Sequence, residues 1–507
     1  MPKYSVKSRF SISFFSNAFR GTLTLVTGLL IGRSLGPQNY GDFVFLMGTF
    51  VGVKQLLDMG SGHAFYTFIC QKPRGKKFVA SYVAWQGLQF LLPLIFIGLL
   101  FPDQWIARLW VGQGKGLILI AFVATFMKDN AWVTMSNIGE SFRLTREVQF
   151  FNIFIVVTHF LLILALSWTQ HLSLYFLFSL IAIEYLVAIC VAFRVLCGNR
   201  LVDERFDGKK VWNGYFNYCA PLILISVLGF GREFTDRWFL QKYGGSEEQG
   251  FYGIGYQLVV VSLLATASLL RIYWKEIAEA HENNDLERMY KLHHKVCRFL
   301  FMVAALISGF LIPWSEEIIR LFLGPAYLGG SPALAVMFLY PIYQSLGLIG
   351  GSFLLAVEKT KPKVVLEGLV IIIAIPVSYF VQAPVDAPLP GLELGSLGMA
   401  LKMVILCVVS SNLVLWWIAR HYSWKFDWVY QVLVLAVTFM LGQLSFEGVK
   451  FLSTILPMNL IFKGGIALLA YTLVAGISLW FIPRIAGLTR DEIKTQIFQA
   501  AQLLKKT

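Results

Sequence analysis

The decisive stretch of sequence is Arg33-Ser-Leu-Gly-Pro-Gln-Asn-Tyr-Gly-Asp-Phe43, which recurs 209 positions later as Lys242-Tyr-Gly-Gly-Ser-Glu-Glu-Gln-Gly-Phe-Tyr252. Aligned without a gap, the two segments share a base, two glycines and an aromatic residue. A second pair, Ala107-Arg-Leu-Trp-Val-Gly112 and Ile319-Arg-Leu-Phe-Leu-Gly324, follows at a shift of 212. Each match alone is weak, because glycine-rich turns are common. Two matches in the same order at nearly the same shift predict an internal repeat.

The composition places this repeat in a membrane. Hydrophobic residues make up 57% of the 507 residues and charged residues only 14%, against about 25% charged in an ordinary soluble domain. This excludes a soluble enzyme, a disordered chain and a disulfide scaffold. We predict an all-α integral membrane protein, because about fourteen apolar segments are long enough to cross a bilayer. These segments are 10–32, 43–69, 78–101, 115–138, 149–168, 172–195, 216–239, 251–273, 297–314, 331–357, 364–382, 397–419, 428–447 and 460–482.

The distribution of basic residues predicts the orientation of the chain. The formal net charge is +14, which in a soluble domain would indicate nucleic acid. In a membrane protein, Lys and Arg instead collect in the cytoplasmic loops. With the N-terminus inside, about 30 of the 43 Lys and Arg residues fall in such loops. We therefore expect a multi-pass protein of a bacterial or archaeal plasma (inner) membrane, with both termini cytoplasmic and no nucleic-acid partner.

The repeat also predicts the domain organisation. Each repeat holds six spans, an even number, so the two halves have the same orientation in the membrane. We expect one six-helix bundle at 1–198 and a second at 199–422, which rock about a central cleft. Residues 423–482 would add two transmembrane helices, and 483–507 would form an amphipathic helix on the inner leaflet.

Two further polar features are interpreted as structural. The loop 275–296 is predicted to be a solvated helix with His281, His293 and His294 at the surface, because their spacing matches no metal site. Lys402 lies near the end of a span, from where its side chain can reach the membrane surface. Neither feature is assigned to the functional site.

Charged residues inside the spans are the functional candidates, because burying a charge in lipid is costly. Three pairs of opposite charge are spaced four residues apart, which also allows plain pairing within one helix: Lys54 with Asp58, Arg232 with Asp236, and Glu233 with Arg237. Arg20 has no acid within reach on its own helix and lies about 15 Å into its span at 1.5 Å per residue. The neighbours Lys128 and Asp129 point in different directions. Glu184 is isolated, and is either a protonated core acid or part of an ion path.

These residues define the predicted site. We expect a cationic substrate cavity formed by Arg20, Lys54, Lys128, Arg232 and Arg237. Five acids would tune its charge or couple it to an ion: Asp58, Asp129, Glu184, Glu233 and Asp236. The sequence contains no phosphate-binding loop, nucleophile elbow or zinc-protease motif. We therefore expect no catalytic residue, no metal and no cofactor. Any energy would come from an ion gradient, with H+ or Na+ as the coupling ion, from the membrane potential or from a substrate gradient.

The sequence resembles the polysaccharide-transporter family, which includes the Wzx O-antigen flippases and belongs to the superfamily of the MATE exporters and the lipid II flippase MurJ. The matching segments are Gly32 to Phe43, Leu57-Asp-Met-Gly60, Asp236-Arg237 ahead of Gly250-Phe-Tyr252-Gly, and Phe322-Leu-Gly324 with Tyr327. The resemblance implies two six-helix bundles around a cationic cavity. It also implies translocation of undecaprenyl-pyrophosphate-linked oligosaccharide for surface polysaccharide synthesis, with a polymerase and glycosyltransferases as protein partners.

Two other functions remain open. A MATE-like, cation-coupled exporter of small molecules would require a net acidic cavity, and the spans hold slightly more bases than acids. A polyprenyl-dependent glycosyltransferase or polymerase could use Asp42 as a base. Such an enzyme would need a substantial outer loop, which is missing from the sequence, so we interpret Asp42 as a turn residue.

Overall fold

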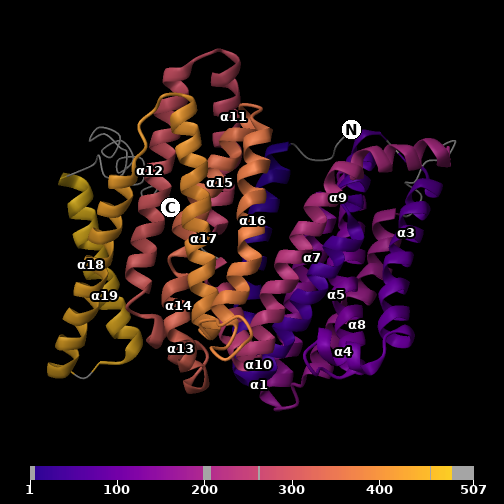
Figure 1. The fold of residues 1–507 in the computed structure, drawn as a ribbon, viewed down its shortest axis with the longest axis horizontal. Coiled ribbons are helices and arrows are strands. Elements are labelled where there is room, and N and C mark those ends of the chain that lie inside the picture. The colour runs from indigo at the N-terminus through magenta and orange to yellow at the C-terminus, as the bar shows by residue number, and fades with distance from the viewer. Residues whose placement is uncertain (1–5, 73, 198–206, 261–262, 457, 482–507) are drawn as a thin grey trace. The chain divides into compact units, whose positions relative to one another are not determined.

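The computed structural model is all-helical, which confirms the predicted fold class (Figure 1). It describes residues 6–72, 74–197, 207–260, 263–456 and 458–481. The α-helices are α1 (Val6–Asp58), α2 (Ser61–Gln71), α3 (Lys76–Ile95), α4 (Asp103–Leu109), α5 (Lys115–Phe126), α6 (Trp132–Ser141), α7 (Thr145–Trp168), α8 (Leu174–Ala192), α9 (Gly208–Phe239), α10 (Gly245–Val260), α11 (Leu263–Glu282), α12 (Leu286–Leu311), α13 (Ser315–Phe322), α14 (Ser331–Met337), α15 (Tyr340–Ala356), α16 (Thr360–Gln382), α17 (Gly395–His421), α18 (Trp428–Ile455) and α19 (Leu460–Phe481). Short π-helical or 3-10 turns are η1 (Phe96–Leu100), η2 (Met127–Ala131), η3 (Phe193–Cys197), η4 (Leu240–Gly244) and η5 (Pro325–Gly330).

Many of these helices can cross a membrane. Among the described residues, eleven helical stretches are long and apolar enough, or up to twelve when the bent pair Phe15–Asp58 and Ser61–Gln71 is counted as one span. The stretch α1 alone has 53 residues, about 80 Å at 1.5 Å per residue, whereas the hydrocarbon core of a bilayer is ~30 Å thick. It consists of two successive helices that meet at Gly36. The number of fourteen spans stays a prediction.

The breaks between successive helices fall at equivalent positions of the repeat. Gly36 has φ 75° and ψ 167°, and Gly245, 209 positions later, has φ 82° and ψ 179°. Only glycine adopts this backbone conformation readily. In the second repeat pair, α4 and α13 begin 212 positions apart, and each is followed by a glycine with positive φ, Gly112 and Gly324. Both pairs of repeated segments therefore have matching backbone geometry.

The chain forms two compact units, which we describe separately. Unit 1 contains Met1–Ile254 with Ala374–Ser396, and unit 2 contains Gly255–Ile373 with Leu397–Thr507. These units are defined by contacts between helices, which do not test the predicted domain bounds. The bundles at 1–198 and 199–422 and the separate hairpin at 423–482 therefore stay predictions. The predicted amphipathic tail lies outside the described residues.

Unit 1 is held together by α1, which packs against α5, α7 and α9, and by α8, which packs against α5. A hydrophobic core of α2, α3, α6, α7 and α8 includes Phe65, Tyr82 and Trp132. In unit 2, α12 packs against α11, α15 and α18, and α19 lies beside α18 (Figure 1). Large apolar side chains such as Leu99 and Leu369 are exposed on the outside. In a membrane protein these side chains face lipid rather than water.

The hairpin of α18 and α19 is attached to α12 by a close crossing. A β-carbon added to Gly442 on α18 would lie 1.9 Å from the carbonyl oxygen of Gly309 on α12. One added to Gly309 would lie 2.7 Å from the carbonyl oxygen of Thr438. Small residues at such crossings let transmembrane helices approach closely.

Candidate functional site

The two repeated segments cross each other within unit 1 at a pair of glycines. A β-carbon added to Gly41 would lie 1.6 Å from the carbonyl oxygen of Ser246. One added to Gly250 would lie 2.1 Å from the carbonyl oxygen of Pro37. Gly41 is equivalent to Gly250 in the repeat, and Pro37 to Ser246. The contact is therefore reciprocal: the glycine of each repeated segment packs against the equivalent carbonyl oxygen of the other segment.

Asp42, next to this crossing, accepts three hydrogen bonds. Its Oδ1 accepts from Gln113 Nε2 at 2.7 Å, from Gln241 Nε2 at 2.9 Å and from Ser246 Oγ at 2.6 Å. The carboxylate thus ties the start of the second helix in α1 to the segment before α5 and to the η4–α10 junction. This arrangement gives Asp42 a structural role.

Four predicted site residues lie together on α9. Glu233 Oε1 lies 3.0 Å from Arg232 Nη2, and Glu233 Oε2 lies 4.0 Å from Arg237 Nη2. Asp236 accepts a hydrogen bond from the hydroxyl of Ser378. The predicted pairing of Glu233 with Arg237 is therefore present, and Glu233 also pairs with Arg232.

The guanidinium of Arg237 lies directly on the second helix of α1. A β-carbon on Gly48 would lie 1.9 Å from Arg237 Nε, so a larger residue there would require the Arg237 side chain to move. Arg237 Nη1 donates to the carbonyl oxygen of Val44 at 3.4 Å, and its buried Nε has no hydrogen-bond partner in the described part of the chain. The Arg237 guanidinium is thus enclosed, but its hydrogen-bonding capacity is not fully used within the described residues.

A second group of predicted residues surrounds η2. Lys54 donates a hydrogen bond to the carbonyl oxygen of Asp129 in this π-helical turn. Arg20, Lys128, Asp129 and Glu184 all lie within electrostatic reach of the Tyr185 hydroxyl on α8. Arg20 Nη2 also donates to Asn17 Oδ1 at 3.1 Å. π-Helical turns are frequent at functional sites, and this one carries Lys128 and accepts the hydrogen bond of Lys54.

A small polar hollow adjoins this group. It is lined by Lys54, Gln89, Thr125 and Asn130 together with apolar side chains of α1 and α5. Gln89 Nε2 donates to the carbonyl oxygen of Leu57 at 3.0 Å, while its buried Oε1 has no partner among the described residues.

Asp58 does not pair with Lys54 within the described residues, although the two lie one turn apart on α1. Its Oδ1 accepts from Ser61 Oγ at 2.8 Å and from the Gly62 nitrogen at 2.9 Å. These bonds cap the first turn of α2 after the chain bends at Gly60. Asp58 therefore stabilises the bend between α1 and α2.

Glu184 has a partner that the sequence did not reveal. Its Oε2 lies 2.7 Å from Nδ1 of His159 on α7, and the Glu184 side chain is only 9% exposed. The other carboxylate oxygen, Oε1, is buried without a hydrogen-bond partner in the described part of the chain. His159 and Glu184 are about equally far from the α7–α8 turn. In an antiparallel hairpin such residues face each other, so this symmetry was a usable signal.

Two predictions for unit 2 are wrong. His293 is not a surface residue, because it is 8% exposed and its Nδ1 lies 2.6 Å from the Tyr273 hydroxyl. Lys402 does not reach the membrane surface, because it is 4% exposed inside α17. No group of three or more potential metal ligands occurs among the described residues.

Solved structures with the same fold are transport proteins. A structure of the lipid II flippase MurJ in an inward closed conformation matches with a TM-score of 0.68 and 14% identity, covering 93% of this chain and 99% of that chain. An inward-facing multidrug resistance MATE family transporter of the MOP superfamily matches with a TM-score of 0.56 and 12% identity, covering 80% of this chain and 94% of that chain. At these identities the likeness shows the fold alone. The chain has the fold of the MurJ and MATE transporters.

Comparisons with protein-family models and with curated protein sequences return no match.

Proposed function

We propose that the protein is a flippase that translocates a polyprenyl-pyrophosphate-linked oligosaccharide across the plasma membrane for surface polysaccharide synthesis, as in the polysaccharide-transporter family. One observation carries this proposal. Three bases that lie deep in predicted spans belong to one region of unit 1: Lys54 donates to the carbonyl oxygen of Asp129 in η2, Lys128 is the chain neighbour of Asp129, and Arg20 and Lys128 both interact electrostatically with Tyr185. Such a group is suited to an anionic substrate.

The chemistry of a pyrophosphate supports this assignment. Its oxygens accept charge-assisted hydrogen bonds from Arg and Lys, which are stronger in a site shielded from water. The polyprenyl tail can remain in lipid while the charged head group crosses between helices. The fold shared with a lipid II flippase is compatible with a lipid-linked substrate. Arg232 and Arg237 would then contact the head group at a later stage, because Glu233 already neutralises part of their charge.

The crossing of Gly41 and Gly250 suggests how access is controlled. In the predicted orientation both repeated turns lie at the outer face of the membrane. Their contact, with the hydrogen bonds to Asp42, would close this end of unit 1. Release of the head group to the outer leaflet would require α10 to separate from α1. Coupling to H+ or Na+ through the acids would supply the energy for this step.

The experiment that tests the function is deletion of the gene. We expect the deletion strain to lose surface polysaccharide and to accumulate the lipid-linked oligosaccharide in the inner leaflet. Plasmid-borne protein should restore both. A deletion strain with normal polymer and no accumulated intermediate would refute the proposal.

A MATE-like exporter of organic cations is the second candidate, because the α9 group has equal numbers of acids and bases and the fold is shared with a MATE transporter. The same deletion strain distinguishes the two functions. Increased susceptibility to cationic drugs with intact surface polysaccharide would support export. The opposite pattern supports the flippase.

A further inference from the structure

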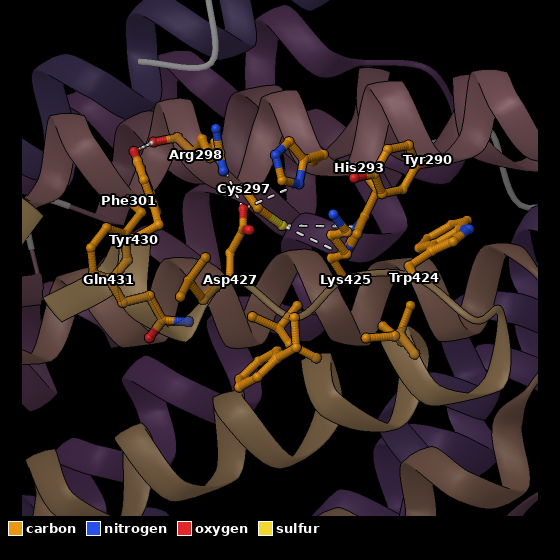
Figure 2. Close-up of a pocket in the computed structure, with 16 residues that line it drawn as sticks. Tyr290, His293, Cys297, Arg298, Phe301, Trp424, Lys425, Asp427, Tyr430 and Gln431 are labelled. Carbon is orange, nitrogen blue, oxygen red and sulfur yellow. Dashed lines mark hydrogen bonds and ion pairs between the residues drawn. The ribbon is translucent and has the colours of Figure 1, made fainter. Parts of the chain in front are cut away.

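A hollow lies in unit 2, between α12 and the segment 422–427 that joins α17 to α18. Figure 2 shows Asp427 pointing from this segment towards Arg298 on α12. Trp424 and Tyr290 stand at one end of the hollow, and Tyr430 and Gln431 at the other. The hollow shares no residue with the charged groups of unit 1.

The single anionic side chain of the lining is already neutralised. Asp427 Oδ2 accepts a hydrogen bond from Arg298 Nε at 2.8 Å and lies 3.2 Å from His294 Nδ1. The Arg298 guanidinium also lies 4.7 Å from the centre of the Tyr430 ring. Because Lys425 adds a second permanent positive charge, the lining carries a net positive charge even with neutral histidines.

Several hydrogen-bond donors of the lining have no acceptor. They are both Nη atoms of Arg298, Nζ of Lys425, the hydroxyl of Tyr290 and Nε1 of Trp424, none of which has a hydrogen-bond partner in the part of the chain that the structure describes. Unpaired donors around a positively charged hollow suit a ligand with several anionic oxygens. A phosphate group has this chemistry.

We propose that this hollow binds the phosphate of an anionic phospholipid head group. The adjoining surface favours a lipid over free phosphate. Helix α18 begins at the hollow with the exposed Trp428, and Val432 and Leu433, one turn further on, are 57% and 59% exposed. Apolar side chains there can contact acyl chains. Tryptophan is typical of the level of the head groups in a membrane.

The depth of the hollow agrees with this assignment. Arg298 lies twelve residues after the start of α12, about 18 Å along the helix, so the α11–α12 turn projects beyond the hollow. In the predicted orientation this end of unit 2 faces the cytoplasm, where the inner leaflet supplies anionic lipids.

The test uses the full chain, purified in detergent, and native mass spectrometry. It is titrated with dioleoylphosphatidylglycerol, and with dioleoylphosphatidylcholine as the zwitterionic lipid. Lys425→Gln changes an exposed residue and leaves the packing intact. We expect it to weaken binding of the phosphatidylglycerol about tenfold, with little change for the phosphatidylcholine. The matched control is Arg420→Gln, which removes an exposed base at the end of α17 that does not line the hollow.

A second variant keeps the test informative if a single substitution at Arg298 prevents folding. Arg298→Gln alone would leave Asp427 without its main partner, whereas Arg298→Gln with Asp427→Asn removes the whole pair. The double variant should also lose phosphatidylglycerol binding. Three results would overturn the proposal: equal losses for Lys425→Gln and Arg420→Gln, equally tight binding of both lipids, or complete competition by inorganic phosphate.

Discussion

Gly41 on α1 and Gly250 on α10 face each other so closely that neither has room for a side chain. A β-carbon on Gly41 would lie 2.9 Å from the nitrogen of Gly250, and one on Gly250 would lie 3.3 Å from the nitrogen of Gly41. The neighbouring carbonyl oxygens of Ser246 and Pro37 are closer still. The two repeated segments therefore depend on both glycines for their contact.

Gly250→Ala is expected to push α10 away from α1. Overpacking of this kind costs about 1–3 kcal/mol, so the unfolding temperature should fall and transport should decrease. The measurement is thermal unfolding of the purified variant together with complementation of the deletion strain. The control is Gly368→Ala on α16, where a β-carbon meets nothing within 4 Å. An unchanged unfolding temperature for Gly250→Ala would contradict the close crossing.

Substitutions of Asp42 distinguish a structural role of its carboxylate from a role as a catalytic base. Asp42→Ala removes the acceptor of Gln113 and Ser246, whereas Gln241 Nε2 keeps its hydrogen bond to Ser246 Oγ. We expect a loss of stability of about 1–3 kcal/mol. Asp42→Asn keeps an acceptor oxygen and should retain most of the stability and function. Thermal unfolding and surface polysaccharide are measured for both variants. If Asp42→Asn folded normally but abolished polymer formation, a role for Asp42 as a base would be favoured instead.

Arg20 and Lys128 are predicted to bind the head group of the substrate. Arg20→Gln and Lys128→Gln should each reduce transport at least about tenfold, the size expected for loss of a charge-assisted hydrogen bond. Arg20→Lys should keep part of the activity, because it keeps the charge. Polymer yield is normalised to protein level. The control Lys77→Gln removes an exposed base at the start of α3, and an equal effect there would argue against a specific site.

The pair of His159 and Glu184 is the best candidate for coupling to H+. A proton on the unpartnered Oε1 of Glu184 would remove a buried charge. Glu184→Gln mimics this state and should make transport in proteoliposomes insensitive to an imposed pH gradient. Glu282→Gln, an exposed acid at the end of α11, should behave as the unmodified protein does. Transport that follows a Na+ gradient and ignores pH in the unmodified protein would refute the proposal.

The features that follow from the local chain could be predicted, and those that depend on contacts between helices could not. The glycines of the repeat predicted where α1 and the α9–α10 stretch break, because positive φ is a property of the residue itself. The pairing of Lys54 with Asp58 follows from their spacing on one helix, and both do lie on α1. The bend at Gly60 adds competing donors, Ser61 and Gly62, which occupy Asp58 at the first turn of α2.

Interaction partners on different helices could not be predicted. Their identification requires the depth of each residue in the membrane and the packing of the helices. Glu184 seemed isolated because His159 lies 25 positions away, on the opposite arm of a hairpin. His293 was assigned to the surface because the polar sequence around it concealed the packing of α11, α12 and the segment before α18. In both cases the local sequence pattern was read correctly as helical, but it did not show which face of the helix is covered.

The reciprocal contact between Gly41 and Gly250 has a consequence for ancestry. An interface is self-complementary when each half contributes the same two positions and each position contacts the other position in the opposite half. Two separate copies of a single six-helix polypeptide would make the same contact about a twofold axis. A duplicated and fused gene would inherit this contact from such a homodimer.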